Sequence, residues 1–460
     1  MTLFHPFGRL ATTDRPPVAS RTRLVARAGS PLRRSLAVTA VALAAALPGA
    51  SQALDFGPFT LTGFAKAEFV RGTNHCMDCQ FLPLEAKDRY WADEIVQGRA
   101  YKTTETHVTL FQPYLAVKFD LPKGFKLSAL LSQRWRDGKE DIPGFFYDKS
   151  VAVAHEDYGS LRAGAMTTRA WSVADYPYGS NVGLADMWGS AGAGYGLLTN
   201  ALRYTSRLFD VADGDLVLEA TYDQGNTGFK RNKPRFLEFW AQYHKGDLFV
   251  DAMYQDARNG TPAAWGHGPF TGLTPFPADD SKLGGSGQSM AMVMARYDIN
   301  ARFEVSGGIR LNRWSGAYAV ITQPGAAGTP DLWNNMFNVC WSANQPGCVR
   351  GYPATSTDAY AGLRYRTGKW IASTGVGYLG KASTDNPTER GQSNSALINT
   401  LGLSYELQPG LQFYGLAGMV HYGRLGLAPM SMPSNASFTN VDSRVSKVGN
   451  WLGVGAVYVF

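Results

Sequence analysis

Apolar and polar residues alternate along many short segments of this chain, from Phe59 to its end. Successive side chains of a β-strand point to opposite faces, so a period of two gives each strand one apolar and one polar face. Three segments show this clearly. In the first, the apolar face carries Phe125, Leu127, Ala129 and Leu131, and the polar face carries Lys126, Ser128, Ser132 and Arg134; in the second, the apolar face carries Leu216, Leu218, Ala220 and Tyr222, and the polar face carries Asp215, Glu219, Thr221 and Asp223. In the third, the apolar face carries Phe303, Val305, Ile309 and Leu311, and the polar face carries Arg302, Glu304, Ser306, Arg310 and Asn312. The pattern predicts an all-β protein.

The connections between these segments alternate between short and long. The seven short ones carry Gly, Pro, Asp and Asn, as tight hairpins require: Leu121–Gly124, Glu156–Gly159, Asp210–Gly214, Lys245–Gly246, Asp298–Asn300, Thr367–Lys369 and Gln408–Gly410. The eight long ones are Gly72–Glu105, Arg136–Phe145, Thr168–Thr199, Gln224–Pro234, Asp256–Gly287, Ser315–Thr357, Gly380–Ser393 and Gly423–Ser446. Together they predict sixteen strands.

Such sorting of loops is typical of a transmembrane antiparallel up-and-down β-barrel. Lipid offers the backbone no hydrogen bonds, so a membrane sheet must close on itself. An even number of strands leaves both termini on the periplasmic side, with short turns there and long loops outside. The charged faces must then line the lumen, because a basic residue facing the middle of the bilayer costs about 2–4 kcal/mol.

Aromatic residues recur at one height of the predicted strands. They lie on the apolar face, just before a short turn or the C-terminus, as a girdle at the membrane interface requires. The members are Phe119, Tyr204, Tyr243, Tyr297, Tyr365, Tyr405 and Tyr458, and His155 interrupts the series.

The last ten residues, 451–460, place Leu452, Val454, Ala456, Tyr458 and Phe460 on one face, with Gly453 and Gly455 on the other. This ending resembles the closing strand of bacterial outer-membrane barrels. The resemblance implies that Tyr458 and Phe460 belong to the signal that the barrel assembly machinery reads.

The N-terminus has the three parts of a signal peptide. Arg33 and Arg34 precede an apolar run from Leu36 to Leu47, and small residues follow up to Ala53. We expect residues 1–53 to be removed and residues 54–460 to form a single barrel domain. The cleavage site is placed to within a few residues, and the long charged region leaves open a true start downstream of Met1. Arg33-Arg34 alone supports a twin-arginine signal only weakly.

Charge and cysteines refine this description. Of 44 basic and 37 acidic residues, seven arginines and one aspartate lie in residues 1–53, so the mature chain has a net charge of +1. Such a balance gives no reason to expect a nucleic-acid partner. Cys76 with Cys79, and Cys340 with Cys348, form two local pairs that suggest loop disulfides in an exported protein. A zinc site using all four is a weaker alternative, and we expect neither metal nor cofactor.

Sixteen strands, a leader, a long third loop and a terminal Phe together resemble the trimeric porins of Gram-negative bacteria. Asn200–Tyr204 is similar to the Asn-Ser-x-Arg-Tyr stretch after the third loop of that family, whereas the acidic Pro-Glu-Phe motif of many enterobacterial third loops is absent. The resemblance implies a homotrimer in the outer membrane, surrounded by outer-membrane lipids and lipopolysaccharide. It also implies passive diffusion of small hydrophilic solutes and ions, with the third loop folded into the lumen.

The resemblance further implies a constriction where acids of the third loop face bases of the barrel wall. The third loop, Thr168–Thr199, supplies Asp175 and Asp186, with Arg169 as its one base. The candidate wall residues on lumen faces are the bases Lys66, Arg134, Arg162, Arg203, Arg310 and Arg364 and the acids Glu68 and Glu219.

The sequence leaves three alternatives open. The first is a substrate-selective channel of eighteen strands, which has a similar pattern, and the loop Ser315–Thr357 is long enough for an extra hairpin. The second is an outer-membrane barrel enzyme, with His107 and His421 near the outer ends of strands but without a serine motif. A narrower, plugged adhesin or structural barrel is a third possibility.

The leader gives the first prediction. The mature protein isolated from outer membranes should begin within a few residues of Leu54, because the small residues before it suit the cleavage enzyme. Intact-protein mass spectrometry measures this start. A mature N-terminus before Arg33 would contradict it.

Overall fold

The computed structural model describes residues 53–73, 103–140, 148–169, 197–224, 235–258, 286–316, 354–381, 383–384, 395–423 and 448–460. Within these ranges no helix has the length and hydropathy needed to cross a membrane.

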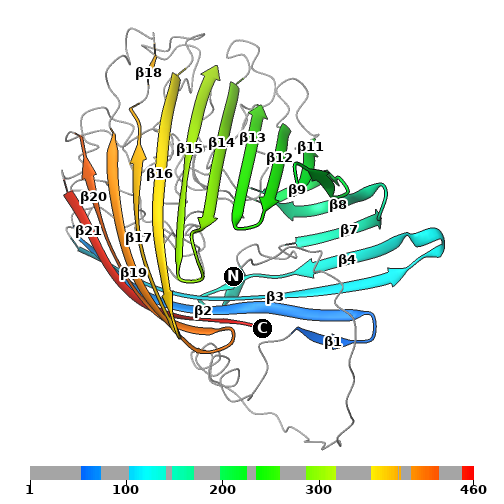
Figure 1. Ribbon diagram of the computed structural model, residues 1–460, viewed down its shortest axis with the longest axis horizontal. Helices are drawn as coiled ribbons and strands as arrows, with labels where there is room; N and C mark the ends of the chain where they lie inside the picture. Colours follow the sequence, from blue (N-terminus) through cyan, green and yellow to red (C-terminus); the bar gives the residue numbers. More distant parts are fainter. Residues whose placement is uncertain are drawn as a thin grey trace, which may run out of the picture.

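Sixteen of the described strands form one closed antiparallel barrel (Figure 1). In order around the wall they are β2 (Phe59–Thr73), β3 (Thr103–Asp120), β4 (Lys126–Ser132), β7 (Asp148–His155), β8 (Gly159–Thr167), β9 (Leu197–Thr205), β11 (Gly214–Asp223), β12 (Arg235–Lys245), β13 (Leu248–Arg258), β14 (Ser286–Asp298), β15 (Phe303–Gly316), β16 (Ala354–Thr367), β17 (Trp370–Leu379), β19 (Ala396–Gln408), β20 (Leu411–Tyr422) and β21 (Val448–Val459). The last strand, β21, pairs with β2 and closes the ring. The predicted architecture is confirmed.

The eighteen-stranded alternative is wrong for this wall. β15 pairs directly with β16 along Phe303–Trp314, so the connection between them adds no strand to the ring at that point. β16 begins at Ala354, so the last four residues of the loop that the sequence predicts belong to this strand.

Short accessory strands extend the wall. β1 (Leu54–Phe56) pairs with β2, β10 (Phe209–Val211) pairs with β11, and β18 (Ser383–Thr384) pairs with β16. β5 (Trp135–Arg136) and β6 (Lys139–Glu140) form a small hairpin at the start of the second predicted long loop.

The short turns lie where the sequence predicts them. Between β3 and β4 the chain makes a 3₁₀ turn over Pro122–Gly124. Between β10 and β11, Ala212 and Asp213 have φ values of 51° and 60°, the positive values of a type I′ hairpin turn.

The two faces of the wall are reversed relative to a water-soluble protein. Leu452 and Leu401 on the outer face are 65% and 60% exposed, whereas Arg310 and Asp358 on the inner face are fully buried. Phe303, Ile309 and Leu311 of β15 are exposed, while Glu304, Arg310 and Asn312 are covered, as the alternation predicts. A greasy exterior and charged interior are what lipid around the barrel requires.

Most of the predicted aromatic girdle is on the outer surface. Phe119, Tyr204 and Tyr297 are nearly half exposed. Aromatic pairs on neighbouring strands stabilise this girdle. The ring centroids are 4.8 Å apart in both Phe303–Tyr365 and Trp370–Tyr405.

His155 and Tyr458 differ from the simple pattern. The His155 ring lies 4.7 Å from the rings of both Phe125, to which it is tilted, and Tyr158, on which it stacks. Its Nε2 lies 3.1 Å from the Lys123 carbonyl oxygen, so it joins two of the short turns. Tyr458 is only 5% exposed, because its ring stacks on Phe460 and its register neighbours Ala65 and Leu411 are also buried.

The terminal Phe460 completes the seam between the first and last strands. Its backbone exchanges two hydrogen bonds with Gly63 of β2, with N···O distances of 2.8 and 3.0 Å. A Cβ on residue 63 would lie 2.7 Å from the Phe460 ring and 2.6 Å from the Gln112 carbonyl oxygen, so only glycine fits there.

This seam gives the second prediction. Deleting Phe460, or replacing Gly63 with Val, should lower both the yield of folded barrel in outer membranes and its unfolding temperature, because seam hydrogen bonds are lost or displaced. Densitometry of folded and heat-denatured protein measures the yield. The control is Phe413→Ser. It removes an aromatic side chain that faces the lipid and that does not belong to the seam formed by Phe460. Equal yields for all variants would contradict a role of the seam.

Candidate functional site

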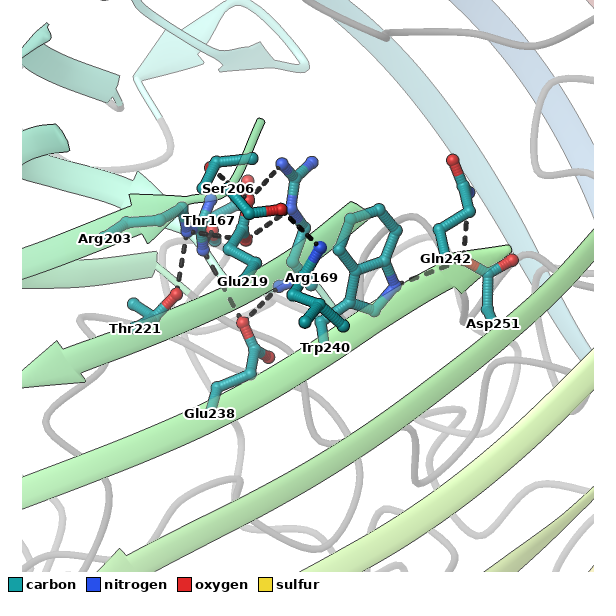
Figure 2. Close-up of polar contacts among 12 residues, drawn as sticks. Thr167, Arg169, Arg203, Ser206, Glu219, Thr221, Glu238, Trp240, Gln242 and Asp251 are labelled. Atoms are coloured by element: carbon teal, nitrogen blue, oxygen red, sulfur yellow. Dashed lines mark hydrogen bonds and ion pairs between the residues drawn. The ribbon is translucent and has the colours of Figure 1, made fainter. Parts of the chain in front are cut away.

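Polar side chains converge where the third long loop leaves the wall after β8 (Figure 2). The pairing of β8 with β9 shifts register between Gly164 and Met166, and Gly164 has a φ of 130°, which favours glycine. After this irregularity Thr168 is buried and Arg169 reaches the inner face of β11 and β12.

Arg169 is held by two carboxylates and an indole. Its Nε and Nη2 each donate a 2.6 Å hydrogen bond to Glu219, a bidentate geometry that is strong and directional. Its backbone N–H donates to Glu238 Oε1 at 2.9 Å, and its guanidinium lies 4.7 Å from the Trp240 ring centroid. Burial alone would lower the pKa of Arg169, but Glu219 and then Glu238 raise it above its ordinary value, so the group stays charged.

Arg203 of β9 shares the same carboxylates. Its Nε lies 3.0 Å from Glu219 Oε1, and its Nη2 lies 3.6 Å from Glu238 Oε1. It also donates to Thr221 Oγ1 and to the Thr167 carbonyl oxygen, both at 2.8 Å. Two arginines and two glutamates therefore balance in charge. We call Arg169, Arg203, Glu219 and Glu238 the loop-root cluster.

Further polar contacts extend the cluster across β12 and β13. Gln255 donates to Glu238 Oε2 at 2.6 Å, and Thr205 donates to Glu219 Oε2 at 2.7 Å. Trp240 Nε1 and Gln242 Nε2 both donate to Asp251 Oδ1, at 3.1 and 3.0 Å. Alternation along β12 and β13 places these side chains on the inner face, although sequence reasoning did not select Glu238, Trp240 or Asp251.

Arg310 forms a second inner-face pair. Its Nε and Nη2 lie 3.0 and 2.7 Å from Asp358 Oδ2 on the neighbouring strand β16. Asn312 also donates a hydrogen bond to Asp358 Oδ2, and the Gly380 backbone N–H donates to the other carboxylate oxygen of Asp358 at 2.9 Å. Asp358 is thus a partner that the sequence reasoning missed, opposite Arg310 in the strand register.

Arg364 belongs to a third group, nearer the short turns. Glu304 lies 3.1 Å from Arg364, 2.6 Å from Arg366 and 3.9 Å from Arg296. The Arg296 guanidinium also lies 4.0 Å from the Phe249 ring centroid. Arg366 extends to Asp298 at 3.9 Å, so bases slightly exceed acids here.

Lys66 and Glu68 pair with each other on β2. Lys66 Nζ lies 3.1 Å from Glu68 Oε2, which also accepts a 2.7 Å hydrogen bond from the Tyr414 hydroxyl. The Tyr414 ring lies over Gly455, where any Cβ would collide with it. Gly455 therefore provides space for an aromatic ring on the inner face of the wall.

Arg162 differs from these paired bases. It is only partly covered, and it lies directly opposite Arg203 in the register of β8 and β9. Asp148 is the acid that acts on it electrostatically, and that carboxylate accepts a hydrogen bond from Ser150 at 3.0 Å. Among the described residues, Arg162 makes no close ion pair. Arg134 lies on the inner face of the neighbouring wall and is 2% exposed.

Several predicted residues lie outside the described ranges. Asp175 and Asp186 belong to residues 170–196, and Cys76, Cys79, Cys340 and Cys348 belong to the segments 74–102 and 317–353. The opposed charges of the loop and the two disulfides stay predictions.

Solved structures of outer-membrane proteins share this architecture. An anion-selective porin from Comamonas acidovorans is 13% identical, with 87% of this chain and 99% of that chain covered at a TM-score of 0.57. Outer-membrane expressed OmpT of Vibrio cholerae is 13% identical, with 89% and 100% covered at a TM-score of 0.51. An in-vitro folded, trimeric form of the same protein is 14% identical, with 88% and 100% covered at 0.53. At these identities the likeness shows the fold alone.

No curated relative matches the sequence. The model of one protein family, described as Gram-negative porin, matches residues 37–425, which is most of the chain. This match agrees with the closed sixteen-stranded wall and its reversed faces. The chain belongs to the Gram-negative porin family.

Proposed function

We propose that this outer-membrane barrel passes small hydrophilic solutes and ions by passive diffusion, and that its third loop is fixed at one end by the loop-root cluster. The observation that carries the proposal is the closed wall with apolar residues outside and charged residues inside. Charged walls around a pore replace part of a solute's hydration and set ion preference.

The loop-root cluster supports a fixed start for the third loop. Arg169 is the last described residue before residues 170–196, and four of its groups or faces are engaged by β11 and β12. Breaking a buried ion pair from one side leaves an uncompensated charge, which costs about 3–5 kcal/mol. We infer that this cost prevents the first residues of the loop from leaving the wall.

Arg162 is the base we assign to solute contact. Arg203, Arg310 and Lys66 each have a carboxylate within about 3 Å, so their fields are largely cancelled. The guanidinium of Arg162 is charged and has no carboxylate at such a short distance among the described residues. Its side chain on the inner face is only partly buried. Arg134, Asp175 and Asp186 remain further candidates for the constriction.

We also propose a homotrimer surrounded by outer-membrane lipids and lipopolysaccharide, assembled by the barrel assembly machinery after loss of residues 1–53. One structural relative is described as a trimer form. The seam at Phe460 supports a role for the C-terminus in assembly.

The described histidines favour a channel over a barrel enzyme. The His107 ring lies 4.7 Å from the Phe69 ring in a tilted arrangement, and His421 Nε2 lies 3.3 Å from Met419 Sδ. They stand on β3 and β20, which β2 and β21 separate in the wall. Within the described strands, neither imidazole contacts a serine or a carboxylate.

The proposal predicts stepwise ion conductance. Purified protein added to a planar bilayer should give discrete current steps in simple salt, because the lumen is wet. Heat-unfolded protein at the same concentration is the control. A bilayer that stays silent at every voltage would contradict an open pore.

Selectivity tests the role of Arg162. Arg162→Gln should lower the anion-to-cation permeability ratio roughly two- to fivefold, since a unit charge at about 4 Å is worth about 1 kcal/mol in water. Reversal potential in a salt gradient measures the ratio. Arg313→Gln removes the same charge from the outer face and should leave the ratio unchanged. Equal permeability ratios for Arg162→Gln and wild type would contradict the assignment of Arg162 to solute contact.

The loop-root cluster gives a further prediction. Arg169→Gln should raise single-channel conductance or its noise and should lower the unfolding temperature, because Glu219 loses its bidentate partner and Glu238 loses a nearby positive charge. A double-mutant cycle with Glu219→Gln should show coupling of about 1–3 kcal/mol in unfolding free energy. Additive effects, with conductance unchanged, would show that Arg169 does not hold the loop.

A further inference from the structure

Four methionines lie together on the inner face of the neighbouring strands β13 and β14 (Figure 1). Met290, Met292 and Met294 alternate along β14 with outward residues such as Val293, which is 47% exposed. Met253 of β13 lies directly opposite Met292 in the strand register. None of the four side chains is more than 4% exposed. We call Met253, Met290, Met292 and Met294 the thioether cluster.

Methionine is concentrated at this place and is not a general filler of the wall. The described residues contain two other methionines, Met166 and Met419, which lie on β8 and β20. At other buried apolar positions of the inner face the side chains are aliphatic, such as Val70, Ile398 and Leu416. Packing needs only such hydrocarbon groups. It therefore does not explain why three alternate positions of one strand, and the position facing the middle one, all carry sulfur.

The strand register makes Met292 the centre of the thioether cluster. Directly opposite residues have Cβ atoms about 5 Å apart, and alternate residues of one strand lie about 7 Å apart. Met253 is opposite Met292, while Met290 and Met294 are the next inward residues on either side of it. A methionine side chain has three rotatable bonds, so thioethers at these spacings can turn toward one ligand.

Met294 is turned away from the other three. Its Sδ lies over Gly308 of β15, where any Cβ would collide with the sulfur. The three remaining thioethers, those of Met253, Met290 and Met292, are therefore the ligands that we assign, and Met294 borders them.

A carboxylate lies beside the cluster. Asp251 is directly opposite Met294 and is the next inward residue of β13 after Met253. Its Oδ1 accepts hydrogen bonds from Trp240 and Gln242 (Figure 2), and within the described part of the wall it makes no ion pair. Its negative charge favours a cation at the neighbouring sulfur atoms.

The base on the other side of the cluster is already paired. Arg310 of β15 lies opposite Met292, but its Nη2 is 2.7 Å from Asp358 Oδ2. The thioethers themselves are neutral. The positive charge nearest to the cluster is thus balanced by its own partner, and it repels a bound cation only weakly.

The chemistry of the ligands selects the kind of cation. Thioether sulfur is a soft ligand that suits Cu(I), whereas Mg²⁺ and Ca²⁺ take oxygen ligands. Ag(I) has the same charge as Cu(I) and is also soft. Among the residues that the structure describes, no group of three or more histidines, cysteines, aspartates or glutamates is placed to hold a metal ion, so the sulfur atoms of methionine are the soft ligands that this part of the wall offers.

We propose that the thioether cluster binds a soft monovalent metal ion of the Cu(I) and Ag(I) class, with Met253, Met290 and Met292 as its ligands. The inference rests on the wet lumen of the proposed function, through which an ion reaches the inner face, and adds a metal site to it.

The experiment titrates Ag(I) into the mature protein in detergent and nitrate buffer, after free thiols have been blocked with N-ethylmaleimide. Wild type should bind Ag(I) at one site per chain. Met253→Leu/Met290→Leu/Met292→Leu nearly keeps the side-chain volume but removes three sulfur atoms, so it should bind at least about tenfold more weakly. The matched control is Met166→Leu/Met419→Leu, which removes two thioethers outside the cluster and should bind like wild type.

Methyl NMR tests the same site without any substitution in the protein that is titrated. With ¹³C-labelled methionine methyl groups, the resonances of Met253, Met290 and Met292 should shift when Ag(I) is added, while that of Met419 should stay in place. A cluster that serves packing alone would leave all of these resonances unshifted, and shifts confined to methionines outside the cluster would also overturn the site.

The binding outcomes are separate from those of the pore. Wild type that binds no Ag(I), or a triple variant that binds it as tightly as wild type, would overturn the thioether site even if the protein conducts ions. Equal loss of binding in the triple variant and in the control would overturn it as well. A silent bilayer together with tight Ag(I) binding would contradict the open pore alone.

Discussion

The structure depends on one constraint: a backbone surrounded by lipid must find all its hydrogen-bond partners within the protein. A sheet meets this condition only by closing, and here closure is made where β21 pairs with β2. Phe460 and Gly63 continue that ladder to the periplasmic edge. Once the ring is closed, each strand has one face toward lipid and one toward the lumen, and the alternation of side chains follows from that division.

The charged interior is an ordered set of partners. Arg169 and Arg203 share Glu219 and Glu238, Arg310 is paired with Asp358, and three arginines surround Glu304. Pairing lowers the cost of placing charge away from bulk water and gives the wall a defined pattern of dipoles. It also means that the number of lumen charges is a poor guide to selectivity, since most of them act on one another. We therefore propose that a base such as Arg162, with no close partner among the described residues, acts on a passing solute more strongly.

The fold was predictable from the sequence because period-two alternation and turn residues are local signals. Lys126, Ser128 and Ser132 identify the inner face of β4 without knowledge of any neighbour. The partners of the site were harder to predict. Glu238 and Asp358 become relevant only when strand register places them beside Arg203 and Arg310, and register depends on every turn between them. Tyr458 was misjudged for a similar reason, because its cover comes from Phe460 and from the strand across the seam.

The position of the seam has a consequence for biogenesis. Phe460 follows the last strand of the wall, and its partner Gly63 lies on the first. The other strands of the ring lie between these two residues in the sequence, so a partly exported chain can form hairpins but cannot pair the two ends of the sheet. Closure of the cylinder therefore requires that both ends of the wall have been translocated.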